Sequence, residues 1–119
     1  MLSATLEQAA AKPFAHPNEL DRKRIERALK TRKRYRYVKP KVATAVGGYR
    51  IESPCCSRNI DPEGGVVDVA LLLHDADGAR WQLFRKDHAQ GLWLLDSTHE
   101  RLPTALERLT ADPERSFWQ

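Results

Sequence analysis

Cysteine is scarce in this chain of 119 residues, and the only two cysteines are the neighbours Cys55 and Cys56. Adjacent cysteines are hard to bridge without strain, and a single pair makes no disulfide framework. The sequence therefore predicts a reducing, cytoplasmic setting. The first eight residues contain no basic stretch followed by an apolar one, so we expect no secretory signal.

Long apolar runs are also missing, and none approaches the about 20 residues that a membrane-spanning helix needs. This excludes an integral membrane protein. Glycine and proline contribute only 6 and 7 residues, which excludes fibrous and collagen-like proteins. The hydrophobic share of 41% is too high for a wholly disordered chain, and the length suits one hydrophobic core.

Charge is distributed unevenly along the sequence. The formal net charge is +4, but residues 22–41 hold eleven basic residues against the single acid Glu26, which gives this segment a charge of +10. The rest of the chain carries a charge of −6. Such a concentration of cations is typical of nucleic-acid-binding proteins, and it also occurs as a solvated helix face.

The basic segment 22–41 predicts a small, non-enzymatic module that contacts the phosphates of DNA or RNA without strong sequence preference. Arginine outnumbers lysine there, and the guanidinium group suits phosphate geometry. The residues expected to contact phosphate are Arg24, Arg27, Lys30, Arg32, Lys33, Arg34, Arg36, Lys39 and Lys41. Tyr35 and Tyr37 are expected to stack on bases, although a strand would turn them away from Arg34 and Arg36. Two other interpretations of the segment stay open, namely a surface neutralised by the chain's own carboxylates and a site for an acidic protein.

The expected domain organisation is a weakly structured arm over residues 1–16 and a single domain over residues 17–119. Pro13 interrupts the helix propensity of the arm. Asn18 is a good N-cap, and Glu19 and Asp21 follow it in the first turn, so a basic helix is predicted over residues 19–33. A second helix is predicted over residues 102–111, ended by Asp112 and Pro113.

Between these helices the sequence predicts about five antiparallel strands in a meander. Expected strands cover residues 42–46, 49–53, 66–74, 80–86 and 92–95. Gly47 and Gly48 are expected to form a two-residue hairpin turn, and Gly78 to take the left-handed conformation in the next turn. Strands do not alternate with helices, so the predicted class is α+β, with the two helices packed on one sheet.

A second functional hypothesis is a protein-interaction or homodimerising module without a nucleic-acid role. Two short helices are few to cover the predicted sheet. Phe117 and Trp118, near the end of the sequence, would form an exposed apolar patch that favours aggregation unless they pack against another surface. We expect these two residues either to cover the sheet or to form an interface with a second copy of the chain.

No motif of metal or cofactor binding stands out, so none is expected. The residues considered for a metal are Cys55, Cys56, His74, His88 and His99, which lack the repeated pairing of a zinc site. Asp75 and Asp77 resemble the start of a calcium loop, but Lys86 occupies the position that requires glutamate. A third hypothesis is a thiol-dependent enzyme that uses Cys55 or Cys56, and no spacing typical of a catalytic triad supports it.

Several segments together carry a family resemblance over about residues 19–118. These segments are residues 24–29, 48–52, 81–87, Trp93 and 112–118. The most specific piece is the terminal Asp-Pro-x-x-x-Phe-Trp. The sequence resembles a family of small bacterial proteins known only as a domain of unknown function, which implies no catalytic residue. It departs from that family in being more basic over residues 32–41 and in having Cys55 and Cys56.

Overall fold

The computed structural model describes residues 16–32, 39–54 and 65–118. Within these residues the chain forms a helix, five strands and a second helix. The elements are α2 (Glu19–Leu29), β1 (Lys41–Ala45), β2 (Gly48–Pro54), β3 (Val66–Asp75), β4 (Arg80–Asp87), β5 (Leu92–His99) and α3 (Leu102–Ala111). The predicted α+β class, with a five-stranded antiparallel sheet and two helices, is confirmed.

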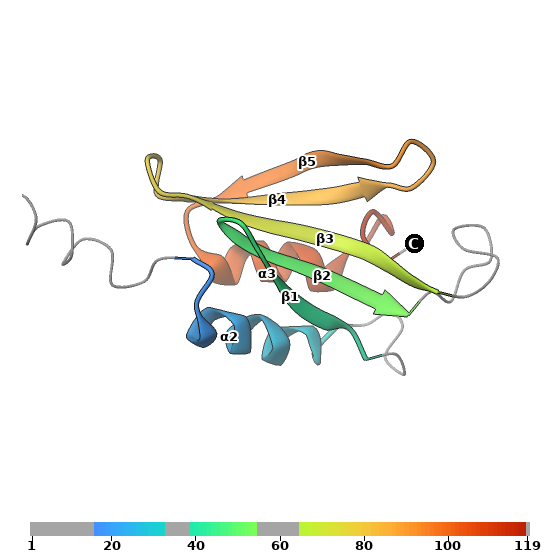
Figure 1. Cartoon of the computed structure of the whole chain (residues 1–119), viewed down its shortest axis with the longest axis horizontal. Coiled ribbons are helices and arrows are strands. Elements are labelled where there is room, and N and C mark those ends of the chain that lie inside the picture. The colour runs from blue at the N-terminus through green and yellow to red at the C-terminus, as the bar shows by residue number, and fades with distance from the viewer. Residues whose placement is uncertain (1–15, 33–38, 55–64, 119) are drawn as a thin grey trace, which may run out of the picture.

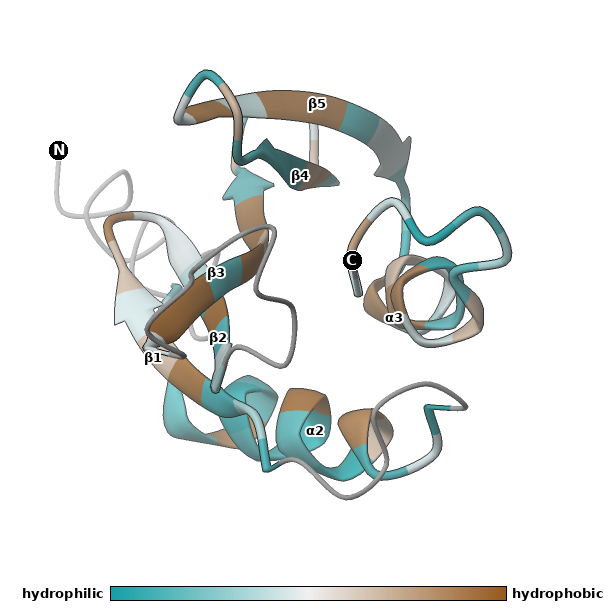
Figure 2. Cartoon of the chain, turned by 90° about the vertical axis from the view of Figure 1, so that its right-hand side faces the viewer, coloured by the Kyte–Doolittle hydropathy of each residue, from teal (hydrophilic) through white to brown (hydrophobic). Residues whose placement is uncertain are grey.

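The sheet is a simple meander in the order β1-β2-β3-β4-β5, and every pair of neighbouring strands is antiparallel. It curves, and both helices lie within its concave side (Figures 1 and 2). The core fills the space between the concave face and the helices. Its largest fully buried apolar side chains are Ile25, Leu29, Tyr49, Ile51, Leu72, Leu83, Leu109 and Phe117.

The first hairpin turn lies one residue earlier than predicted. Ala45 pairs with Gly48, so the two-residue loop consists of Val46 and Gly47, and Gly47 has the positive φ of 78°. Gly48 belongs to β2, where a Cβ atom would lie 1.9 Å from the backbone oxygen of Leu72. Gly48 is therefore required for close packing of β2 on β3, and Gly47 for the turn conformation.

Other details of the elements and turns also differ from the prediction. The helix α2 ends at Leu29 because the N–H groups of Lys30, Thr31 and Arg32 bond to carbonyls three residues earlier, which tightens the final turn. In the second hairpin, Ala79 and not Gly78 has positive φ. The strand β5 continues to His99, because pairing with β4 resumes after a register shift.

Candidate nucleic-acid-binding groove

A groove of ≈ 890 Å³ lies between α2 and α3. The two helices run side by side beneath the sheet (Figures 1 and 2). Lining residues from α2 are Asp21, Arg24, Arg27 and Ala28, followed by Thr31 just beyond the helix. Those from α3 are Leu102, Pro103, Leu106, Glu107 and Thr110. His16, Trp81 and Arg101 complete the lining.

Helical periodicity explains which residues reach the groove. In α2, Ile25 and Leu29 turn into the core, so Arg24 and Ala28 come to its edge, spaced four residues apart. In α3, Leu106 is mostly buried, and Glu107 and Thr110 follow on the side toward α2. The groove is thus the seam between the buried stripes of two amphipathic helices, with polar side chains at its rims and apolar ones on its floor.

Arginines dominate the charge of the groove. Arg27 and Arg101 are exposed, and neither forms an ion pair within the described part of the chain. Arg24 bonds Asp21, with 3.1 Å between its Nη1 atom and Oδ1, and its side chain remains 60% exposed. With Asp21 and Glu107 as the acidic members, the groove retains a net positive charge.

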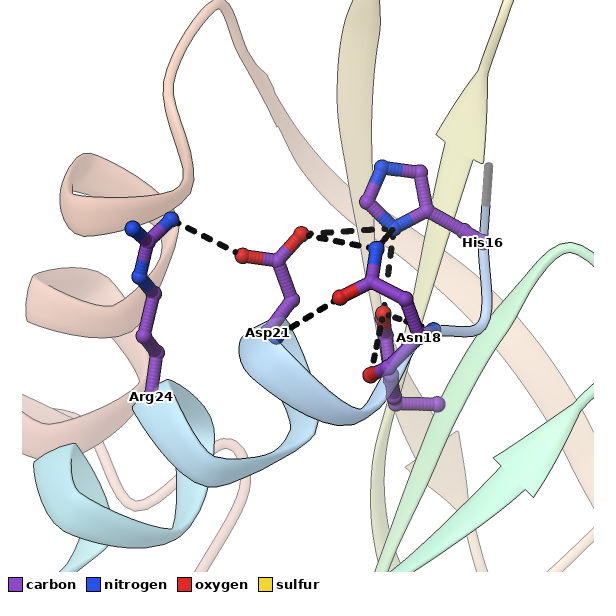
Figure 3. A network of polar contacts seen from close by, with 5 residues as sticks. His16, Asn18, Asp21 and Arg24 are labelled. Carbon is purple, nitrogen blue, oxygen red and sulfur yellow. Dashed lines mark hydrogen bonds and ion pairs between the residues drawn. The ribbon is translucent and has the colours of Figure 1, made fainter. Parts of the chain in front are cut away.

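A polar network fixes the end of the groove where α2 begins (Figure 3). Asn18 caps α2 as predicted, since its Oδ1 atom accepts the N–H of Asp21 at 2.8 Å. The N–H of Asn18 donates to the hydroxyl of Tyr49 at 2.9 Å, and that hydroxyl lies 3.0 Å from His16 Nδ1. His16 Nδ1 also lies 3.5 Å from Asp21 Oδ2. These contacts attach the start of α2 to strand β2.

His16 packs among aromatic rings as well as polar atoms. Its ring centroid lies 4.5 Å from that of His74 and 4.6 Å from that of Trp81. Burial lowers the pKa of His16, His74 lowers it further, and Asp21 opposes both effects. The imidazole is therefore held neutral near pH 7, so it acts there as a packing and hydrogen-bonding group.

The predicted phosphate-contacting residues have different environments. Arg24 and Arg27 line the groove, whereas Lys30, Lys39 and Lys41 are exposed outside it. Lys33, Arg34 and Arg36 lie outside the described residues, as do Tyr35, Tyr37, Cys55 and Cys56. The thiol-enzyme hypothesis therefore stays a prediction. Sequence reasoning missed His16, Trp81 and Arg101 as groove residues.

Arg32 is not part of the exposed basic surface that the sequence predicted. It is only 4% exposed, and its Nη1 atom donates to the backbone oxygen of Leu29 at 2.7 Å. Its guanidinium carbon lies 4.9 Å from the ring centroid of Trp118. Because α2 ends early, this side chain caps the helix carboxyl end and packs on an aromatic ring. Its burial removes it from any phosphate contact.

Phe117 and Trp118 are in the core and do not form the predicted intermolecular interface. Both are 2% exposed, so the alternative of docking on their own domain describes the structure. Asp112 takes the left-handed conformation, and its carboxylate accepts the N–H groups of Ser116, Phe117 and Trp118 at 2.7 to 3.2 Å. The indole of Trp118 donates to the oxygen of Leu109 at 3.0 Å. The Asp-Pro-x-x-x-Phe-Trp segment thus ends α3 and places two aromatic side chains in the core.

Within the described ranges, no three histidine, cysteine, aspartate or glutamate side chains gather in a way that could hold a metal ion. No helix among the same residues is long and apolar enough to cross a membrane.

Comparison with known proteins gives one match. The family model described as "Domain of unknown function (DUF3024)" matches residues 13–119, which include every residue of the groove. No curated protein and no solved structure matches the chain. The predicted resemblance to an uncharacterised family is thereby confirmed.

Proposed function

We propose a function for this chain, which belongs to the family of the domain of unknown function DUF3024: it binds nucleic-acid phosphates without strong sequence preference. The observation that carries the proposal is the groove in which Arg24, Arg27 and Arg101 converge from two elements. Guanidinium groups bind phosphate through paired N–H donors, so three of them around one groove favour a phosphate-bearing ligand. Such a role fits the cytoplasmic setting predicted from the two cysteines.

Exposed lysines extend the proposed surface beyond the groove. Lys23 lies on α2 and Lys30 is its C-cap, whereas Lys41 begins β1 and Lys39 lies two residues before it. None of the four forms an ion pair in the described part of the chain. Arg22 is different, because Glu19 and Glu26 both pair with it. The surface thus offers several phosphate contacts.

A salt titration tests this proposal. Affinity for a short oligonucleotide is measured at several salt concentrations, and several phosphate contacts require a steep fall in affinity with salt. The double variant Arg27→Glu with Arg101→Glu should weaken binding and reduce the magnitude of the salt slope by about 1 per lost contact. Arg80→Glu with Arg115→Glu, which makes the same change of net charge outside the groove, is the matched control and should bind like the wild type. A flat salt response, or equal losses in both variants, would refute the proposal.

A second candidate function is self-association through the convex face of the sheet. Opposed residues of neighbouring strands share a face, and Leu71, Phe84 and Leu95 form such a row on the side away from the helices. Leu95 is 53% exposed. Five strands present about 500 Å² per copy, and two copies would bury about 1,000 Å², the lower bound of specific interfaces. A second copy of the chain is the partner that this candidate requires.

A further inference from the structure

We infer that the groove selects single-stranded over duplex nucleic acid, by holding a base against its floor while the arginines at its rim contact the flanking phosphates. This inference rests on the proposed function and adds the class of nucleic acid. It is carried by the apolar residues between the arginines, which phosphate binding alone does not explain.

The size of the groove suits one or two nucleotides. Pockets for small ligands have volumes of roughly 300–1,000 Å³, and the groove falls within this range at ≈ 890 Å³. A duplex is too wide to enter a pocket of this kind, so it would touch only the rims. An unpaired base can leave its neighbours and enter.

The floor has the composition that a base requires. Ala28, Leu102 and Leu106 are apolar, and Trp81 adds the edge of an aromatic ring. Thr31 and Thr110, at the far end from His16, supply hydroxyl groups on opposite walls. Bases stack on aromatic rings and on guanidinium planes alike, so Arg24 and Arg27 serve both the base and the phosphate.

A duplex would leave this floor unused. Its bases are stacked inside, and its phosphates lie on a convex outer surface. The arginines of the groove line a site shared by two helices, and a duplex could contact only those at its rims. A single strand presents bases and phosphates together, so its bases can contact the apolar floor while its phosphates contact the arginines at the rim.

The test compares oligothymidine with a DNA duplex of equal phosphate number by fluorescence anisotropy at one salt concentration. We expect about tenfold tighter binding of the single strand, the gain of stacking roughly one base. Thr31→Leu and Thr110→Leu fill the groove from opposite walls without a change of charge and without adding an aromatic ring on which a base could stack. Each should remove most of the single-strand preference and leave duplex binding unchanged.

Thr104→Leu is the matched control, because Thr104 is exposed on α3 and does not line the groove. It should retain the preference, and thermal melting establishes that all three variants are folded. Equal or tighter binding of the duplex would overturn the inference while leaving phosphate binding intact. So would an undiminished preference in both groove-filling variants. Absence of binding to either probe would instead overturn the proposed function itself.

Discussion

At the scale of single residues, Asp112 has the largest structural role among the polar side chains. It is 0% exposed, and its carboxylate bonds three consecutive backbone N–H groups that α3 itself does not satisfy. Asp tolerates the left-handed conformation better than most residues, because its short side chain bonds locally. One carboxylate therefore both ends the helix and positions two aromatic residues.

Replacing Asp112 should destabilise the domain strongly. In Asp112→Ala the N–H groups of Ser116, Phe117 and Trp118 lose their acceptor, which costs about 3 kcal/mol or more of unfolding free energy. Asp112→Asn retains one acceptor oxygen, so its unfolding free energy should lie between those of the wild type and Asp112→Ala. Urea denaturation followed by tryptophan fluorescence measures both changes. Glu114→Ala, at an exposed neighbouring position, should leave the unfolding free energy unchanged. If Asp112→Ala had the same urea midpoint as Glu114→Ala, the role assigned to Asp112 would be contradicted.

His16 makes the stability of the domain dependent on pH. Burial lowers the pKa of His16 below its ordinary 6.5, so the unfolded chain binds a proton more readily than the folded one. Stability is then complete above about pH 6.5 and falls as the pH drops below that value. His16→Gln should have a smaller drop in melting temperature between about pH 7.5 and about pH 5.5. An unchanged drop would show that His16 has no part in it.

The same measurement applies to His88→Gln, which should also reduce the acid sensitivity. Burial also lowers the pKa of His88, with Lys86 as the next cause, and the residue does not line the groove. The two histidines lie on different parts of the fold, so their contributions to acid sensitivity should add.

At the scale of elements, α3 is attached to the edge strand β5 by an ion pair. Arg108 Nε and Nη2 each donate to one oxygen of Asp96 at 2.9 Å, and the Asp96 side chain is only 6% exposed. The hydrogen bond from Arg108 holds the pKa of Asp96 below its usual value, which burial opposes. The pair therefore stabilises the fold above about pH 4, and this contribution is lost as Asp96 is protonated at lower pH.

Removing the Arg108 side chain should leave Asp96 as a buried carboxylate without its two hydrogen bonds from the guanidinium group. Arg108→Met is expected to cost about 2 kcal/mol at neutral pH, less than for a fully buried pair because Arg108 is 31% exposed. The cost should shrink as the pH falls through the folded-state pKa of Asp96. Denaturation of wild type, Arg108→Met and the double variant with Asp96→Asn, at neutral and acidic pH, measures the coupling. A coupling that does not change with pH would contradict the ion pair.

Local patterns predicted the elements well and their ends less well. Apolar periodicity located both helices, and the bounds of α3 agree with the prediction. The strand β5 extends past Leu95 through polar residues that lack the apolar alternation of a strand, because pairing with Trp81, Gln82 and Leu83 holds them. Beyond the early end of α2, Arg32 packs on Trp118, a contact between distant parts of the chain that local patterns do not predict.

The groove was only partly predictable for the same reason. Arg24 and Arg27 belong to the cluster of basic residues that is visible in the sequence over residues 22–41. His16, Trp81 and Arg101 come from three separate segments, and only the packing of α3 beside α2 brings them together. None of the three stands in a local pattern that distinguishes it from an ordinary surface or core residue.

At the scale of the whole molecule, the sheet has one face covered by helices and one without such cover (Figure 2). If copies associate through the convex face, sedimentation should reveal a dimer whose population rises with protein concentration. Phe84→Lys puts a charge in the centre of the apolar row and should give a monomer with an unchanged far-ultraviolet spectrum. Val46→Lys, at a fully exposed turn, should behave as the wild type. A wild type that is monomeric at every concentration would eliminate this candidate.

The burial of Phe117 and Trp118 has a consequence for biosynthesis. A ribosome makes the chain from the amino end, so α2 and the whole meander emerge before the two aromatic residues that complete their core. Until residues 117 and 118 have been synthesised, the core lacks two of its buried aromatic side chains. The domain can therefore complete its native packing only after synthesis has passed residue 118.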